Sequence, residues 1–146
     1  MEITGKGLII GLWTTLKHLF TRAFTVQYPV EKIVIAPRMR GRHGLRTDEA
    51  GELLCIGCQA CARVCPDKLI TVKTRKTPEG SKKKLEVEDF TLNLEACMFC
   101  GLCTDVCPNT SIVMTNFYEM ATKNRDDIFL TMEKLVESGK GYVPPD

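Results

Sequence analysis

The apolar residues near the start of the chain recur at three- and four-residue steps, which is the period of an α-helix. These residues are Leu8, Ile9, Leu12, Trp13, Leu16, Leu19 and Phe20. Polar residues interrupt the pattern, so no apolar run approaches the ~20 residues that are needed to cross a membrane. Residues 1–24 are therefore predicted to form an amphipathic helix that lies on a membrane surface or against a partner, or alternatively packs on this protein's own core.

The helical period disappears over residues 25–50, where prolines and glycines become frequent. The segment is also basic, and its cationic residues are Lys32, Arg38, Arg40, Arg42 and Arg46. A segment without a hydrophobic face of its own needs another surface to lie on. We predict an extended arm that docks on a partner, with a solvated strand as the simpler alternative.

Apolar and polar residues alternate over residues 69–76, which is the period of a β-strand. Residues 77–81 have the composition of a turn, and residues 83–89 can return as a second strand. These segments predict a hairpin insertion within residues 67–96. The lysines near its turn are interpreted as a solvated face, with docking to a partner as the less favoured alternative.

The helical period returns near the end of the chain, within residues 117–146. Residues 116–124 are predicted to form a helical turn, and residues 126–138 an amphipathic helix. The apolar face of this helix would consist of Ile128, Phe129, Met132, Leu135 and Val136. Gly139 and Gly141 would end the helix, and the last residues would form a tail.

All eight cysteines fall into two copies of one pattern, C-x2-C-x2-C-x3-C-P. The first copy, CIGCQACARVCP, covers residues 55–66, and the second, CMFCGLCTDVCP, covers residues 97–108. This run is typical of bacterial proteins that hold two [4Fe-4S] clusters. Structural zinc and disulfides are the alternatives. Zinc sites usually separate two cysteine pairs by a longer loop, however, and disulfide frameworks rarely show such regular spacing.

The spacing also predicts which cysteines share a cluster, because the fourth cysteine of each run binds the cluster of the other run in two-cluster proteins of this kind. The first predicted cluster is held by Cys55, Cys58, Cys61 and Cys107. The second is held by Cys97, Cys100, Cys103 and Cys65. This crossing would tie the two halves of the domain together through iron, and it leaves no cysteine over.

The two runs form an internal duplication with a constant offset of 42 positions. Apolar residues that match at this offset would shield the clusters from water, and the pairs are Ile56 and Met98, Val64 and Val106, and Ile70 and Ile112. We predict an α+β, ferredoxin-like domain over residues 51–116, with pseudo-twofold symmetry, short helices after the third cysteines and a strand at residues 112–115. The N-terminal helix, the extended arm and the C-terminal helix would be appendages of this domain.

Charge and motif content narrow the possible functions. The formal net charge of +2 would fall to about −2 with two bound clusters, so the basic balance does not favour a nucleic-acid partner. Thiols that bind iron imply a reducing compartment. The sequence has no catalytic acid–base pair, nucleophile motif or phosphate-binding loop, and His18 and His43 are interpreted as surface or packing residues rather than cluster ligands. The chain is predicted to carry electrons without transforming a substrate itself.

Four segments, TVQYPVEKIVIAPRMRGRHGL, CIGCQACARVCP, CMFCGLCTDVCP and NFYEMATKNRDDI, together resemble subunit I of respiratory complex I, the NADH:quinone oxidoreductase. The cysteine runs occur in many proteins, whereas the basic arm is much more discriminating. The resemblance implies an electron-relay subunit with two [4Fe-4S] clusters, placed between the cluster chain that starts at the flavin and the quinone-proximal cluster. The segments CPDKLI and CPNTSI depart from the CP-x-x-A-I that such proteins often show.

The resemblance also implies partners and a location. Other peripheral-arm subunits, including the quinone-proximal iron–sulfur subunit, would contact the chain, and a membrane-arm subunit would receive the N-terminal helix. The protein would be peripheral to the membrane, on the cytoplasmic face of the bacterial inner membrane. The alternatives are a ferredoxin-type subunit of a membrane-bound hydrogenase or a ferredoxin:quinone oxidoreductase, a free two-cluster ferredoxin, and a nucleic-acid-binding protein with structural clusters.

Overall fold

The structure is a computed structural model that describes residues 5–77 and 85–144. The chain divides into two compact units, Met1–Val34 and Ile35–Asp146, and each is described by itself. The predicted turn at residues 77–81 lies, apart from its first residue, outside the described residues. The second unit combines helices with two antiparallel sheets, so the predicted α+β class is confirmed.

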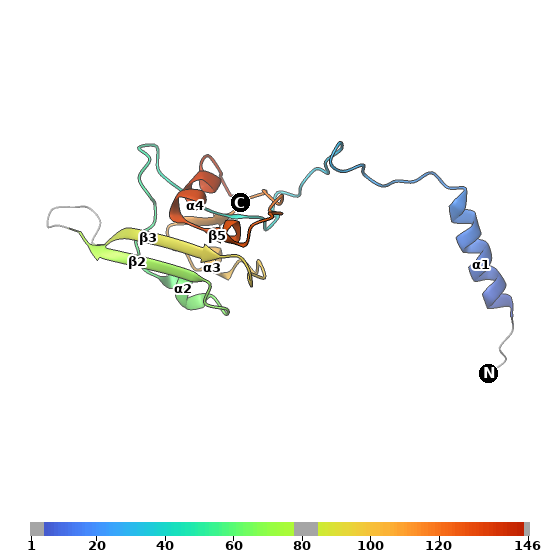
Figure 1. Cartoon of the computed structure of the whole chain (residues 1–146), viewed down its shortest axis with the longest axis horizontal. Coiled ribbons are helices and arrows are strands. Elements are labelled where there is room, and N and C mark those ends of the chain that lie inside the picture. Colours follow the sequence, from blue (N-terminus) through green and yellow to red (C-terminus); the bar gives the residue numbers. More distant parts are fainter. Residues whose placement is uncertain (1–4, 78–84, 145–146) are drawn as a thin grey trace. The chain divides into compact units, whose positions relative to one another are not determined.

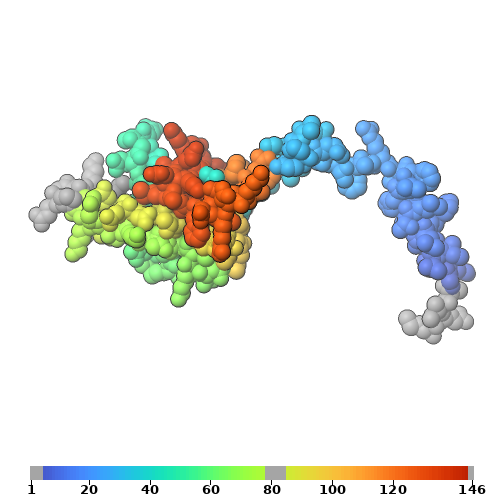
Figure 2. All heavy atoms as spheres, in the orientation of Figure 1, coloured from blue at the N-terminus to red at the C-terminus, as the bar shows by residue number. Residues whose placement is uncertain are grey.

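The first unit contains one helix, α1 (Lys6–Leu19), followed by chain without regular secondary structure (Figure 1). None of the residues of α1 is buried, and Figure 2 shows the first unit in the blue part of the chain. The helix ends before residue 24 because the Thr21 hydroxyl and amide both bond back to the His18 carbonyl in a tight final turn. Within the described residues, no helix has both the length and the apolar character that crossing a membrane requires.

The second unit begins with irregular chain that leads into strand β1 (His43–Leu45). This strand pairs antiparallel with β4 (Ile112–Met114), with Gly44 opposite Val113. Every residue of both strands is buried. The end of the predicted docking arm is therefore part of this protein's own core. The prediction that residues 25–50 lie as a whole on a partner or in solvent is wrong, because β1 finds its pairing partner within the chain.

Strands β2 (Ile70–Lys76) and β3 (Leu85–Asn93) form the long hairpin in Figure 1. The hairpin contributes directly to the core, where Phe90 and Leu92 are almost completely buried. The register between the strands shifts after Lys73, and this shift moves the inward-facing set of residues on β3. The hairpin is thus a wall of the cluster-binding unit, and only its far end is predominantly exposed.

The chain after β4 departs from the prediction in two places. Residues 116–124 contain no helix. The helix predicted over residues 126–138 is divided into a 3₁₀ turn, η1 (Arg125–Ile128), a short strand, β5 (Phe129–Leu130), and a shorter helix, α4 (Met132–Gly139). Both predictions are wrong. The second fails because β5 pairs with the end of β3, where Leu130 lies opposite Leu92 and is buried. Tertiary strand pairing overrides the local helical period here.

Three α-helices complete the described part of the second unit. Helices α2 (Ala60–Val64) and α3 (Leu102–Asp105) contact each other, and each begins one residue before the third cysteine of its run rather than after it. Figure 1 shows α2 and α4 on either side of the β2–β3 hairpin. The last residue of α4, Gly139, lies directly on the backbone of β1, where an added Cβ would collide with the Leu45 carbonyl. Only glycine permits this approach.

Candidate iron–sulfur sites

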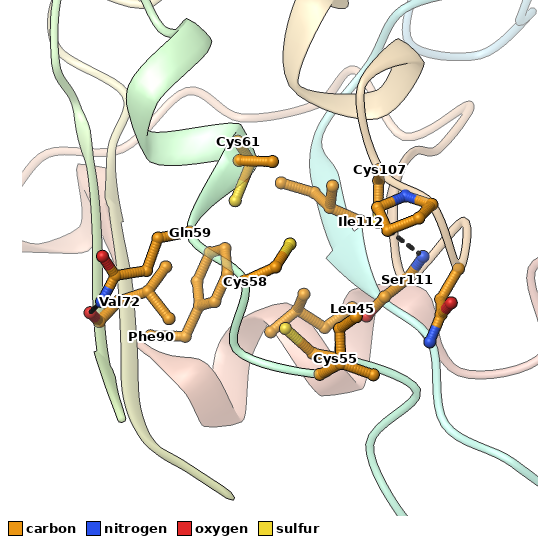
Figure 3. A pocket seen from close by; sticks show the side chains of 14 residues that line it. Leu45, Cys55, Cys58, Gln59, Cys61, Val72, Phe90, Cys107, Ser111 and Ile112 are labelled. Atoms are coloured by element: carbon orange, nitrogen blue, oxygen red, sulfur yellow. Dashed lines mark hydrogen bonds between the residues drawn. The ribbon is translucent and has the colours of Figure 1, made fainter. Parts of the chain in front are cut away.

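The first run and the last cysteine of the second run surround one cavity, which encloses about 380 Å³ including its open mouth. Its cysteines are Cys55, Cys58, Cys61 and Cys107. Figure 3 shows the sulfur atoms of Cys55, Cys58 and Cys61 directed into one space, with Ile112 and Ser111 across it. The structure thus brings together the four cysteines that the spacing predicted to share a cluster.

A second cavity repeats this arrangement in the other half of the unit and encloses about 310 Å³. Its cysteines are Cys65, Cys97, Cys100 and Cys103, which form the other predicted set. The thiols line these cavities without converging on a point. Among residues 5–77 and 85–144, no group of three or more His, Cys, Asp or Glu side chains is arranged around a single metal ion.

The duplication also appears in the backbone that wraps each cavity. Residues with a left-handed backbone conformation occur in pairs separated by 42 positions: Gly57 and Phe99, Gln59 and Gly101, and Lys68 and Thr110. This conformation favours glycine, yet four of the six residues carry side chains. The turns within and directly after each cysteine run therefore hold strained backbone at matching positions, which is a frequent feature of ligand-binding loops.

Hydrogen bonds support both loops in a similar way. The Ser111 amide donates to Cys107 Sγ at 3.2 Å, and the equivalent Leu69 amide donates to Cys65 Sγ at 3.5 Å. Each loop is also held by an arginine. Arg63 donates to the Cys58 carbonyl at 2.9 Å, while Arg40, from the basic arm, donates to the equivalent Cys100 carbonyl. The arm thus supplies to the second cavity a contact that, in the first cavity, comes from an arginine within the cysteine run itself.

The electrostatics of the cavities disfavour free thiolates. Burial raises the pKa of Cys61 to about 11 and that of Cys103 to about 12. Burial also raises the pKa of Cys55 and Cys97. Iron binds cysteine as the thiolate, and a positive centre is what favours that form in an apolar cavity. Four thiols, apolar walls and amide donors aimed at sulfur are therefore a donor set that fits a [4Fe-4S] cluster.

Two buried polar residues that the sequence analysis did not assign to the sites also line the cavities. His43 lies in the wall of the second cavity, stacked on Phe99 at 5.7 Å between ring centroids, and its Nδ1 has no hydrogen-bond partner. Burial lowers the pKa of His43 to about 4, so the ring is neutral. Ser111 lies in the wall of the first cavity. The departure of CPNTSI from the CP-x-x-A-I pattern was the available signal for Ser111.

The apolar shield is only partly as predicted. Ile70 and Ile112, which match at the offset of 42, are both buried, and each lines one of the cavities. Met98 is 64% exposed and Val106 is 40% exposed. Neither residue lines a cavity, so the predicted shielding by them is wrong for this unit by itself.

Comparisons with known proteins agree with this geometry. The family model described as a 4Fe-4S dicluster domain matches residues 54–111. NADH-quinone oxidoreductase subunit I 2 of Geobacter metallireducens is 37% identical over 130 residues, which cover 89% of this chain and 96% of the relative. NADH-quinone oxidoreductase subunit I of Francisella tularensis subsp. tularensis is 42% identical over 135 residues, which cover 92% and 82% respectively.

A solved structure is also similar. It is the membrane-bound sulfane sulfur reductase, an archaeal respiratory membrane complex, with a TM-score of 0.55 and 32% identity. The match covers 78% of this chain and 55% of that chain. The dicluster match and the relatives confirm the predicted ferredoxin-like fold, the two [4Fe-4S] clusters and the family resemblance. The chain belongs to the family of NADH-quinone oxidoreductase subunit I, the electron-carrying 4Fe-4S subunit of a multi-subunit respiratory complex.

Proposed function

We propose that this chain relays electrons through two [4Fe-4S] clusters toward the quinone-proximal cluster of an NADH:quinone oxidoreductase. The observation that carries this proposal is that the two four-cysteine cavities meet at helices α2 and α3. Cys61 on α2 and Cys103 on α3 are close enough for the charge of one to raise the pKa of the other. Two redox centres at such a junction would form one continuous path through the unit.

The proposed ligands are the two crossed sets of four cysteines. Cys55, Cys58, Cys61 and Cys107 would hold one cluster, and Cys97, Cys100, Cys103 and Cys65 the other. A [4Fe-4S] cluster accepts and releases one electron at a time when bound. The residues of this chain supply the thiolates, exclude water with apolar walls, and direct amide dipoles at the sulfur atoms of Cys65 and Cys107.

Docking through the first unit completes the proposal. The large apolar side chains of α1 are all exposed, including Leu12 at 62% and Trp13 at 69%. We expect α1 to lie against a membrane-arm subunit and the cluster unit against peripheral-arm subunits that include the quinone-proximal iron–sulfur subunit. The complex would place the chain on the cytoplasmic face of the bacterial inner membrane. A helix with an apolar face but no spanning length suits such a peripheral position.

Replacement of single cysteines by serine tests which four cysteines hold each cluster. Cys107→Ser should abolish the EPR signal that Cys61→Ser also abolishes, because both thiols line the first cavity. Cys65→Ser should instead abolish the signal that Cys103→Ser removes. Each variant should keep about four of the eight iron atoms expected for two clusters. The assignment is wrong if Cys107→Ser and Cys103→Ser remove the same signal while the other signal persists.

A relay in a different respiratory membrane complex is the second candidate, and the likeness to the sulfane sulfur reductase structure favours it. Purification of the chain from its native membranes in mild detergent distinguishes the two. Co-purification with NADH-oxidising and quinone-reducing activity supports the first proposal. A complex that reduces quinone with reduced ferredoxin but not with NADH supports the second. A chain recovered as a soluble monomer contradicts both and favours a free ferredoxin.

A further inference from the structure

Each cluster cavity has one buried polar side chain besides its cysteines, among the described residues. In the first cavity it is Ser111, which is 1% exposed, and in the second it is His43. Gln59 and Asn109 also line the first cavity, but their amide groups donate to the carbonyls of Val72 and Leu54 and the residues are exposed. Ser111 is therefore the buried polar side chain of the first cavity whose presence no contact within the protein explains.

The backbone and the side chain of Ser111 have different roles. Its amide supports the Cys107 sulfur at 3.2 Å, and the equivalent Leu69 amide does the same for Cys65. The duplication therefore preserves the amide contact whether the residue is serine or leucine. The Ser111 hydroxyl has no counterpart at Leu69, so it is a feature of the first cavity alone.

The hydroxyl is buried without a hydrogen-bond partner, which is unfavourable for a polar group in a protein interior. Figure 3 shows Ser111 at the edge of the space that the cysteines surround. Cys55 lines the same cavity as Ser111, and both are labelled in Figure 3. A serine hydroxyl rotates freely about one bond, so a thiolate at Cys55 would offer it the acceptor that it lacks.

We propose that Ser111 is a positioning and tuning residue whose hydroxyl donates a hydrogen bond to the Cys55 thiolate and raises the reduction potential of the first-cavity cluster. A donor directed at a ligand sulfur stabilises the more negative, reduced state. The second cavity has leucine at the equivalent position and lacks this contribution. The inference rests on the proposed function, because it requires Cys55 and Cys107 to hold the same cluster.

Ser111→Ala tests the inference in the full-length chain with both clusters bound. The substitution removes one buried oxygen and retains the backbone amide, so the unit should fold. In an EPR-monitored redox titration, one of the two centres should become harder to reduce by about tenfold in its equilibrium constant, or about 59 mV for one electron. The other centre should keep its potential. Thr110→Ala is the matched control, because it removes an exposed hydroxyl from the adjacent position, outside the cavity.

A second measurement uses ENDOR of the same variant. The exchangeable protons coupled to the first-cavity cluster include the Ser111 amide, which donates to Cys107 Sγ. Ser111→Ala in H2O should lack one exchangeable proton that the wild type shows in H2O and loses in D2O, and it should keep the amide proton. The inference is overturned if Ser111→Ala keeps both clusters and both potentials, or if Thr110→Ala produces the same shift. An error in the ligand assignment would give a different result, because Cys107→Ser would then leave the EPR signal of the first-cavity cluster intact. If only the hydrogen bond is absent, Cys107→Ser removes that signal while Ser111→Ala does not move its potential.

Discussion

Residues 5–34 and residues 35–144 contain the same kinds of apolar side chain but use them in opposite ways. In the second unit, Leu45, Phe90 and Leu135 are at most 1% exposed and form a core around the cavities. In the first unit, Leu8 and Trp13 are about 70% exposed. An isolated helix as short as α1 is only marginally stable in water. The second unit is therefore organised by its own interior, whereas the docking proposed above would give the first a surface that another molecule supplies.

The largest expected effect follows from separating the two units. Deletion of residues 1–34 should leave iron and sulfide content per chain unchanged, because all proposed ligands lie within residues 55–107 and β1 is retained. The truncated chain should no longer sediment with membranes or with the respiratory complex. Iron analysis and membrane fractionation measure the two outcomes. Loss of iron from the truncated chain would show that the first unit contributes to the fold of the second.

Substitution of glycine by alanine should have opposite signs in the two units. Gly139→Ala places a methyl group against the Leu45 carbonyl and must displace α4 from β1, so it should destabilise the second unit by about 3 kcal/mol. Gly11→Ala in α1 meets nothing within 4 Å and should raise the helix stability by about 1 kcal/mol. Denaturant unfolding followed by cluster absorbance reports the first effect, and far-UV circular dichroism of the isolated chain reports the second. Equal effects of the two substitutions would contradict the conclusion that α4 is packed against its own unit whereas α1 is not.

The smallest expected effect concerns a single side chain of the first unit. Trp13→Ala should not change the unfolding of the cluster unit, because none of the residues of α1 is buried. It should weaken association with the complex by about 1.5–3 kcal/mol, the value of burying one large apolar side chain. Competition between tagged wild-type and variant chains for the complex measures the difference. His18→Ala, on the polar side of α1, is the control and should compete like the wild type.

The cysteine spacing was sufficient to predict which thiols lie together, because ligand geometry constrains the loop more strongly than the intervening residues do. The hairpin was predictable from its alternation. Strand β5 was not, since Phe129 shares a helical period with Met132 and Val136, and only pairing with the end of β3 makes residues 129–130 a strand. The burial of His43 was equally hidden. It depends on pairing with Met114, far along the chain, and contacts of that kind leave no local periodicity.

The residues with a left-handed backbone conformation show a related limit of prediction from the sequence. Glycine signals such a conformation at Gly57 and Gly101, but Phe99 and Gln59 adopt it at the equivalent positions without any signal in their identity. The structure holds them there because the turn between successive cysteines requires it. A repeat in the sequence therefore predicted a repeat in the ligands, whereas the repeat in the backbone became visible only in three dimensions.

The pairing of β1 with β4 has a consequence for the order of events during synthesis. A chain that emerges from the ribosome with its N-terminus first exposes β1 and the first four cysteines before β4 or the second run exists. The second cavity lacks part of its cysteine set until Cys103 has emerged, and the first until Cys107 has. Helix α4 closes over β1 only after residue 139. The nascent protein must therefore keep reduced thiols in an unfinished fold. Insertion of both clusters is accordingly expected only after the second cysteine run has emerged.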